Sequence, residues 1–501
     1  MGVLSLLVSA IYLASTCVVA LFALHEMRLL LWFWRRHRAE PAADDGPVGP
    51  PGELPFVTVQ LPLYNERFTA KGAIEAAAAL DYPRDRLQIQ VLDDSTDETR
   101  DIVDRAVAEA RARGVDIEVV RRTDRTGFKA GALQAAMPSA RGQLLALFDA
   151  DFVPPPEFLR VLLEERRVFD DPRVGFVQTR WEFTNRHQSR FAEIQAMLLD
   201  RHFFLQKPVR ERAGCVTVFN GSAGLWRRAT IEDAGGWSSD TLTEDLDLSF
   251  RAALRGWRGR YVHEVWAGSQ LPLDMLAFKL QQRRWAKGSS QCLAKLVGPI
   301  SRSNGALRHK LDELVMMAGY SVHLAMLVNL LVWPWAVFYV RPSIVFWICQ
   351  VVLAAATVVG PCGFLVAVRQ RGPRPWPSML RDLLAVTALG FGLTVCNAAA
   401  VVSGYLSRDR GTFERTPKLA GEARAEQAYG LRLHWSFYLE LATVAYCALA
   451  VGLLWADGLQ LWSPPLLLTG ACLLLVVFQQ WTVARGSALP GRSGAAVSTG
   501  P

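Results

Sequence analysis

Polar and acidic residues follow several apolar runs of this 501-residue chain, and they are the side chains best suited to bind ions and move protons. They are Asn65 and Glu66 after the first run, Asp93 after the second, and Asp149 and Asp151 after the fourth. Carboxylates repel a diphosphate unless a hard divalent cation, Mg²⁺ or Mn²⁺, lies between them. The period-2 spacing of Asp149 and Asp151 aims both carboxylates to one side of an extended backbone, which predicts a metal site there.

A second group of candidate residues has helical spacing. Gln281, Arg284 and Trp285 recur at i, i+3 and i+4, so a helix places them on one face. The arginine can grip a diphosphate with two hydrogen bonds, and the tryptophan offers a flat face to a sugar ring. A basic amphipathic helix at a membrane surface has the same spacing, so this pattern alone leaves both interpretations open. Lys129 opens a stretch of small residues, where backbone can come close to a ligand.

Alternating strand and helix patterns must position these residues. Runs rich in apolar and β-branched residues predict strands at 56–63, 87–92, 117–121, 143–148 and 174–179. The stretches between them predict helices at 69–80, 98–113, 128–137 and 156–169. This order indicates an α/β domain with a mostly parallel, doubly wound sheet. Ligands bind such sheets beyond the carboxyl ends of the strands, where the acidic residues are expected.

Composition adds a membrane region. Apolar residues make up 51% of the chain and charged residues 20%, and the two kinds are segregated. Apolar runs long enough to cross a ~30 Å hydrocarbon core lie at 3–24, 315–340, 342–368, 383–407, 433–456 and 458–484. The basic residues after the first run indicate a retained anchor with its N-terminus outside. We therefore predict an anchor (1–38), a Pro- and Gly-rich linker (39–55), a cytoplasmic catalytic domain (56–300), a membrane region (301–484) and a tail (485–501).

The motifs, taken together and in order, resemble one enzyme family. They are VQLPLYNE (59–66), VLDDSTDET (91–99), DRTGFKAGAL (124–133), FDADF (148–152), FNGSAGLWRR (219–228), TEDLDLSFR (243–251) and QQRRW (281–285). This set is similar to the processive family 2 glycosyltransferases, which include cellulose, chitin, hyaluronan and curdlan synthases. It is most similar to the plant cellulose-synthase-like A proteins, which make β-mannan and glucomannan.

The resemblance implies a GT-A catalytic fold and a role for each matching residue. It implies that Asn65, Glu66 and Asp93 bind the nucleoside and that Lys129 helps to bind the donor. It also implies that Asp149 and Asp151 bind the metal on the diphosphate, and that Asp245, beside Glu244, is the catalytic base. Gln281, Arg284 and Trp285 then bind the donor diphosphate and the acceptor end, and Trp181 lines the acceptor channel. The implied reaction inverts the anomeric carbon of a UDP-glucose or GDP-mannose donor and extends a β-glycan, which leaves through the membrane.

Two departures refine the resemblance. Asn220 stands in an FNGS sequence where cellulose synthases have Phe-Cys-Gly-Ser, which favours the mannan-type branch. No stretch after the last apolar run matches the regulatory cyclic-di-GMP domain of bacterial cellulose synthases, so we expect no regulatory domain. The segment 408–432 is similar to the gating loop of cellulose synthases through four residues, Phe413, Arg415, Thr416 and Lys418.

A gating loop must be cytoplasmic, and the basic residues of 408–432 agree with that side. We therefore predict five membrane crossings, with 383–407 at or re-entering from the cytoplasmic interface and the C-terminus inside. The alternative is a sixth span with an external basic loop. The expected location is the inner membrane of a bacterium.

A different activity is also compatible with these motifs, namely a single transfer of sugar to a lipid. A third alternative, a transporter or channel, does not explain the large polar domain with acidic strand ends. The expected partners are a nucleotide sugar, a glycan or lipid acceptor and membrane lipids. Nothing in the chain resembles a nucleic-acid-binding module. Donor base, sugar and linkage stay open at this point.

Overall fold

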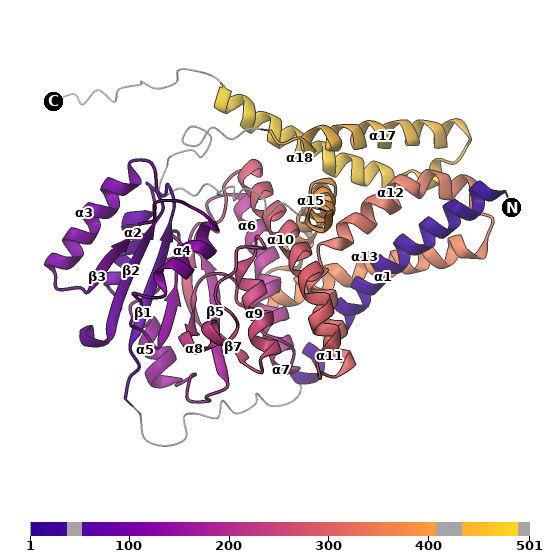
Figure 1. Ribbon diagram of the computed structural model, residues 1–501. Coiled ribbons are helices and arrows are strands. Elements are labelled where there is room, and N and C mark those ends of the chain that lie inside the picture. Colours follow the sequence, from indigo (N-terminus) through magenta and orange to yellow (C-terminus); the bar gives the residue numbers. More distant parts are fainter. Residues whose placement is uncertain (1, 38–52, 407–432, 489–501) are drawn as a thin grey trace, which may run out of the picture.

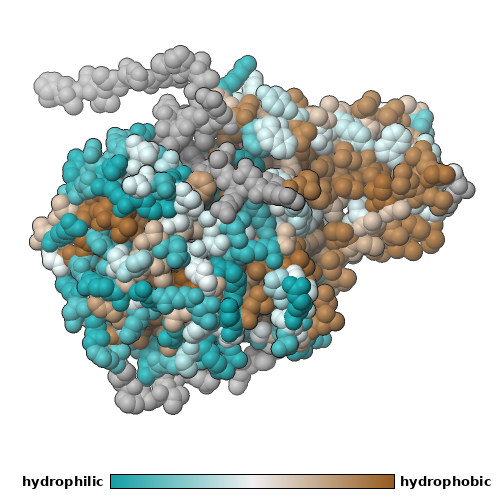
Figure 2. Space-filling model, viewed as in Figure 1, coloured by the Kyte–Doolittle hydropathy of each residue, from teal (hydrophilic) through white to brown (hydrophobic). Residues whose placement is uncertain are grey.

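The computed structural model describes residues 2–37, 53–406 and 433–488. It has two parts, an α/β domain and a bundle of long helices beside it (Figure 1). Hydrophilic residues cover most of the visible face of the α/β domain, and hydrophobic residues cover most of the long helices (Figure 2). The segregation expected from composition is therefore present in the fold.

A seven-stranded sheet forms the centre of the α/β domain, in the order β3-β2-β1-β4-β6-β5-β7. Its strands are β1 (Val57–Leu63), β2 (Leu87–Asp93), β3 (Ile117–Val120), β4 (Leu144–Leu147), β5 (Val174–Phe183), β6 (Gly224–Arg227) and β7 (Arg258–Ser269). Only β6 runs antiparallel to its neighbours, β4 and β5, so the predicted mostly parallel sheet is confirmed. Every residue of β2 is buried, as expected for a strand covered on both faces.

Helices cover both faces of the sheet, and three of the four predicted ones match closely. These are α2 (Ala70–Ala78), α3 (Thr99–Ala112) and α4 (Phe128–Ala136). The helix predicted at 156–169 is shorter, since α5 (Phe158–Arg160) continues only through the π-helical turn η2 (Val161–Glu165). The prolines at 154–156 lack N–H donors and delay its start. Its end precedes Arg167, whose φ of 47° is left-handed.

The remaining elements complete the domain and lead to the membrane region. They are η1 (Arg84–Arg86), α6 (Arg190–Asp200), η3 (Arg201–Gln206), α7 (Lys207–Arg212), α8 (Arg228–Asp233), α9 (Glu244–Leu254), α10 (Met275–Arg302) and α11 (Leu307–Met317). The long helix α10 is the link between the two parts, because it packs on α9 at one side and on membrane-region helices at the other.

Five described helices are long and apolar enough to cross a membrane. They are α1 (Val3–His37), α12 (Ser321–Tyr339), α13 (Ile344–Arg371), α17 (Ser436–Ala456) and α18 (Pro464–Ala488). Two further helices, α14 (Trp376–Gly392) and α15 (Thr394–Leu406), meet at 47° and count as a sixth candidate only if the bent pair is one span. The short turn η4 (Gln460–Trp462) joins α17 to α18. By length and composition, the count of five or six agrees with the prediction.

The direction of these helices bears on topology. In Figure 1, α1 begins at the end of the bundle that points away from the sheet, and α17 and α18 are joined at that same end. Consequently α17 begins, and α18 ends, on the side of the α/β domain. The residues predicted as a gating loop, Phe413, Arg415, Thr416 and Lys418, lie outside the described residues.

Buried ion pairs tie the two parts together. Asp312 of α11 is paired with Arg28 of α1 and Arg210 of α7. Asp200 of α6 is paired with Arg186 and lies 3.2 Å from Arg371 of α13. Such pairs leave their carboxylates with few alternative positions, so the domain is held in one orientation on the helices.

Candidate active site

Lys129 lies at the centre of an acidic group at the carboxyl end of the sheet. Its Nζ donates to Asp149 Oδ1 at 2.6 Å and to the carbonyl oxygen of Gly221 at 2.8 Å, and it lies 3.6 Å from Glu244 Oε1. Burial lowers the pKa of Lys129, but the carboxylates of Asp149 and Glu244 outweigh that effect and raise it above the usual range. The predicted residues Lys129, Asp149 and Glu244 are therefore adjacent, although they come from three different loops and helices.

The wall beside this group is built by the loops after β1 and β2. Asn65 has a left-handed φ of 55°; its backbone N–H donates to Ser95 Oγ at 2.9 Å and its Oδ1 accepts from Thr96 N at 2.8 Å. Asp93 is buried, and it accepts from Ser95 N at 3.0 Å and from Arg121 Nε at 2.9 Å. Both predicted residues thus shape the loops around the nucleoside position expected from the sequence.

Glu66 stands at the start of the helix that follows β1. Its carboxylate accepts from Thr69 Oγ1 at 3.2 Å, and its carbonyl oxygen accepts the first backbone hydrogen bonds of the turn. Glu66 therefore stabilises the turn between β1 and α2, next to Asn65.

Asp149 and Asp151 do not lie on extended backbone, so the geometric premise of the sequence prediction is wrong. A turn spans 149–152, in which Phe152 N donates to Asp149 O at 2.9 Å. Asp149 faces Lys129, whereas Asp151 is buried and accepts from Ser269 Oγ at 2.6 Å. The physical reason is the early end of β4 at Leu147, after which the chain folds over the end of β7.

These residues nevertheless fit a divalent cation held jointly with a substrate. Within the described ranges, no group of three or more His, Cys, Asp or Glu side chains is placed to hold a metal ion alone. Mg²⁺ commonly binds through one or two carboxylates, waters and substrate phosphates rather than in an all-protein cage. The side chain of Asp149 remains 37% exposed, so it can serve as such a ligand.

Asp245, at the start of α9, is the carboxyl group with the most perturbed proton affinity at the site. Burial and the neighbouring carboxylate of Glu244 raise the pKa of Asp245 to about 7, against the opposing charge of Lys129. Leu246 N donates to its Oδ1 at 2.8 Å and fixes the carboxylate at the helix start. A pKa near the working pH is the property expected of a general base.

A short segment before β6 joins these groups, and sequence reasoning gave its residues no catalytic or positioning role. Gly221 has a φ of +81°, and a Cβ at this position would lie 3.0 Å from Asp245 Oδ2 and 3.5 Å from Lys129 Nζ. Ser222 Oγ accepts from Asp149 N at 2.9 Å. Buried Gln178 of β5 bonds to Asn220 N at 2.7 Å and to the carbonyl oxygen of Ser222 at 3.0 Å. A polar residue inside an apolar strand run is the signal that could have identified Gln178.

The three residues of the helical motif lie on α10. Gln281 is buried, and Arg284 and Trp285 are partly buried on the same side of the helix. Farther along that side, Gly288 approaches Thr243 so closely that a Cβ there would lie 2.6 Å from Thr243 Cγ2. The helix that carries the motif is thus packed directly on the segment that leads into Asp245.

Trp181 lies beside the same segment from the opposite direction. Its Nε1 donates to the carbonyl oxygen of Ser222 at 3.2 Å, and its ring packs edge-on against Phe152 with centroids 5.2 Å apart. Its ring is partly buried, and its hydrogen bond to Ser222 supports the segment of 220–222.

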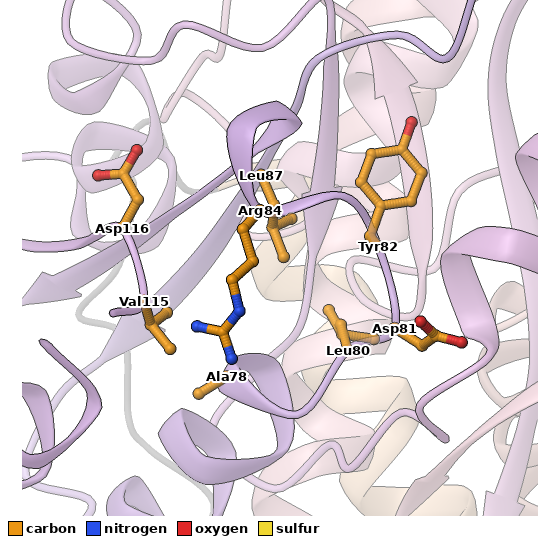
Figure 3. Close-up of a pocket in the computed structure, with 8 residues that line it drawn as sticks. All are labelled: Ala78, Leu80, Asp81, Tyr82, Arg84, Leu87, Val115 and Asp116. Carbon is orange, nitrogen blue, oxygen red and sulfur yellow. The ribbon is translucent and has the colours of Figure 1, made fainter. Parts of the chain in front are cut away.

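A larger cavity lies far from these residues. It has a volume of about 200 Å³ and is lined by residues at the amino ends of β2 and β3, among them Tyr82, Arg84, Leu87 and Asp116 (Figure 3). The predicted residues converge at the opposite, carboxyl ends of the strands, where α/β sheets bind ligands. A smaller cavity lined by Lys129, Ser239 and Glu244 lies at that end.

Comparison with known proteins agrees with this geometry. Residues 55–288 match the family model described as glycosyltransferase like family 2. The chain contains a family 2 glycosyltransferase domain. The fold, the positions of the motifs and the matched range therefore agree with the family predicted from the sequence.

Two curated relatives that match the glycosyltransferase domain come from plants. Glucomannan 4-β-mannosyltransferase 2 of Arabidopsis thaliana is 39% identical over 283 residues, which are 55% of this chain and 52% of the relative. Glucomannan 4-β-mannosyltransferase 1 of Oryza sativa subsp. japonica is 38% identical over 273 residues, 54% of this chain and 52% of the relative. The chain thus aligns with about half the length of these relatives. The predicted similarity to the cellulose-synthase-like A type is confirmed.

A solved structure also aligns with the glycosyltransferase domain and part of the remaining chain. It is a mannosyltransferase from Pyrobaculum calidifontis in complex with GDP-Man and Mn²⁺, with 25% identity and a TM-score of 0.47. The alignment covers 76% of this chain and 97% of that one.

Proposed function

We propose that this protein is a membrane hexosyltransferase that extends a β-glycan from a nucleotide-sugar donor with inversion at the anomeric carbon. The observation that carries the proposal is the placement of Asp245, a carboxyl group with a pKa of about 7, beside Lys129 and Asp149 at the carboxyl end of the sheet. This arrangement supplies a base, a cation and a metal-binding carboxylate around one position.

The proposed chemistry is a direct displacement. Asp245 accepts the proton of an acceptor hydroxyl while that oxygen forms its bond to the anomeric carbon, and the bond from that carbon to the diphosphate breaks. Attack from the face opposite the leaving group converts an α-linked donor into a β-glycoside. Lys129 and Arg284 stabilise the negative charge that develops on the departing diphosphate. A divalent cation held by Asp149, whose carboxylate is partly exposed at the site, would neutralise the same diphosphate; we propose Mg²⁺ or Mn²⁺.

The mannan-type relatives support GDP-mannose as the first donor to test and UDP-glucose as the second. We propose that Gln281, Trp285 and Trp181 hold the acceptor end, and that Asn65, Glu66 and Asp93 border the nucleoside. The helices α1, α12, α13, α17 and α18 then cross the membrane, with the catalytic domain on its cytoplasmic face and the glycan leaving between them. A bacterial inner membrane is the proposed location.

The test is product analysis with membranes that contain the protein. Labelled GDP-mannose, UDP-glucose and UDP-GlcNAc are supplied separately, and the product is digested with linkage-specific hydrolases. We expect an insoluble β-linked polymer from a hexose donor. Asp245→Asn should lose the product, whereas Asp101→Asn, an exposed carboxylate on α3, should retain it as a matched control. Label recovered only in an organic extract would identify single transfer to a lipid and refute polymer synthesis.

A further inference from the structure

A buried polar cluster joins α10 to the membrane helices α17 and α18. Lys279 of α10 is paired with Glu440 of α17, and its Nζ also donates to Gln480 Oε1 of α18 at 2.8 Å. Gln480 Nε2 donates to Glu440 Oε2 at 2.8 Å, which closes the cluster. The exposed fractions of Lys279, Glu440 and Gln480 are 5%, 0% and 1%.

Such a cluster is an unfavourable way to hold helices together. Two charges must be removed from water, and well-packed apolar residues of similar volume are often at least as stable as a buried ion pair. Ionisable residues in membrane helices therefore tend to mark functional positions. Hydrogen-bonded charges fix one geometry between the helices that carry them, whereas apolar packing does not.

The helix α10 has two faces with different neighbours. The face with Lys279 also carries Ala286 and Ser290, at i+7 and i+11. Ala286 packs against Val401 of α15, and Gly404 of α15 lies so close that a Cβ there would be 2.7 Å from Ser290 Cβ. This face therefore belongs to the membrane region along its length.

The opposite face of α10 contacts the segment that leads into the catalytic base. Leu242 N donates to Gln291 Oε1 at 3.0 Å, and Lys295 Nζ lies 2.7 Å from Asp247 Oδ1. Gln281, Arg284 and Gln291 have the spacing i, i+3 and i+10, so the first two lie on this same face. A rotation or shift of α10 would therefore move the motif residues and the base segment relative to each other.

We propose that Lys279, Glu440 and Gln480 are positioning residues for transfer, which set the rotation and axial position of α10 and so place Gln281, Arg284 and Trp285 opposite Asp245. Lys279 precedes Gln281 by two residues, or about 3 Å along the helix axis. The position of Gln281 is thus controlled closely by that of Lys279. A misplacement of about 1 Å can reduce turnover by about 10²-fold. This inference rests on the proposed function, since it concerns the same site.

The test separates positioning from stability. The triple variant Lys279→Met/Glu440→Leu/Gln480→Leu removes every polar group of the cluster and keeps its volume. We expect its thermal unfolding midpoint in detergent to equal or exceed that of the wild type. We also expect its turnover with the hexose donor to fall at least about tenfold. The reversed pair Lys279→Glu/Glu440→Lys keeps the ion pair, and the amide of Gln480 can rotate to bond to the exchanged side chains. This variant should have a higher turnover than the triple variant.

A matched control comes from another polar cluster in the membrane helices. Asn329 of α12 donates to Ser15 Oγ and Thr16 Oγ1 of α1, at 3.2 and 3.1 Å, so these two bonds join membrane helices other than α10. Asn329→Leu makes a similar polar-to-apolar change and should leave turnover within about twofold of the wild type.

Two outcomes would overturn the inference. One is a triple variant that transfers at the wild-type rate. The other is a triple variant whose unfolding midpoint falls together with its activity, which would make the cluster structural only. If the triple variant does not insert, the reversed pair decides, because a folded but inactive reversed pair also contradicts the inference. A wild-type protein that transfers no hexose refutes the proposed function instead, so the two failures are distinguishable.

Discussion

The pH dependence of transfer should report the proton affinity of Asp245 directly. Only the ionised carboxylate can accept a proton, so activity rises with pH as Asp245 loses its own. With a pKa of about 7, roughly one tenth of Asp245 is ionised at pH 6 and roughly nine tenths at pH 8. We therefore expect initial rates, measured at low donor concentration, to increase about tenfold between these two values.

Two substitutions should move this dependence in opposite directions. Glu244 raises the pKa of Asp245 and Lys129 lowers it. Glu244→Gln should therefore shift the acidic limb to lower pH, because it removes the like charge that opposes ionisation of Asp245. The ionised fraction of Asp245 at pH 6 then rises, so the activity at pH 6 relative to pH 8 should exceed the wild-type ratio of about one tenth. Lys129→Met should shift the limb above 7, whatever it does to donor binding.

The assay follows labelled hexose incorporated into polymer between about pH 5.5 and 8.5, with each variant normalised to its own plateau. Normalisation separates the position of the limb from any loss of donor affinity. An acidic limb at the same pH in the wild type, Glu244→Gln and Lys129→Met would refute the electrostatic account of the site. A limb that persists in the residual activity of Asp245→Asn would assign the base to another residue.

Four further predictions concern the metal, the base segment, the acceptor and topology. Asp149→Asn should abolish transfer with the fold intact, and EDTA should inhibit the wild type until Mg²⁺ or Mn²⁺ is restored; full activity in EDTA would contradict this. Gly221→Ala should reduce turnover at least about tenfold, since a left-handed alanine costs ~1–2 kcal/mol and its Cβ would lie 3.0 Å from Asp245 Oδ2; unchanged turnover would be inconsistent with that contact. Trp285→Ala should reduce chain elongation more than donor hydrolysis, whereas an equal loss of both would mean that Trp285 has no acceptor role. A single cysteine at Thr416, outside the described residues, should resist an impermeant maleimide added to intact cells, and its labelling from outside would place that loop on the external face.

Local sequence patterns predicted the parallel half of the sheet well. The strands β1, β2 and β3 and the helices between them lie within one or two residues of their predicted ranges, because buried strands and amphipathic helices each have a period that a short stretch reveals. The apolar runs likewise indicated the membrane region, since a length of about 20 apolar residues is itself the physical requirement for crossing. The ordered motifs identified the family, because each combines residue types that the same chemistry needs.

Features that depend on distant partners were not visible in the sequence. The strands β6 and β7 and the turn at 149–152 are set by pairing across the sheet, and that pairing aimed Asp149 and Asp151 in different directions. The contact of Gly221 with Asp245 and Lys129, and the role of Gln178 beneath it, join segments that are far apart in the chain.

The sequence by itself determined that this chain has a polar α/β domain beside membrane-spanning lengths, and which acidic and basic residues gather at the end of the sheet. Only the tertiary structure decided how they act on one another. The raised pKa of Asp245 arises from burial and from the charge of Glu244, which together outweigh the opposing charge of Lys129. The pairing of Lys279 with Glu440 likewise exists only once α10 packs on α17. Charge interactions fall with distance and depend on exclusion of water, and both quantities are properties of the folded molecule rather than of residue order.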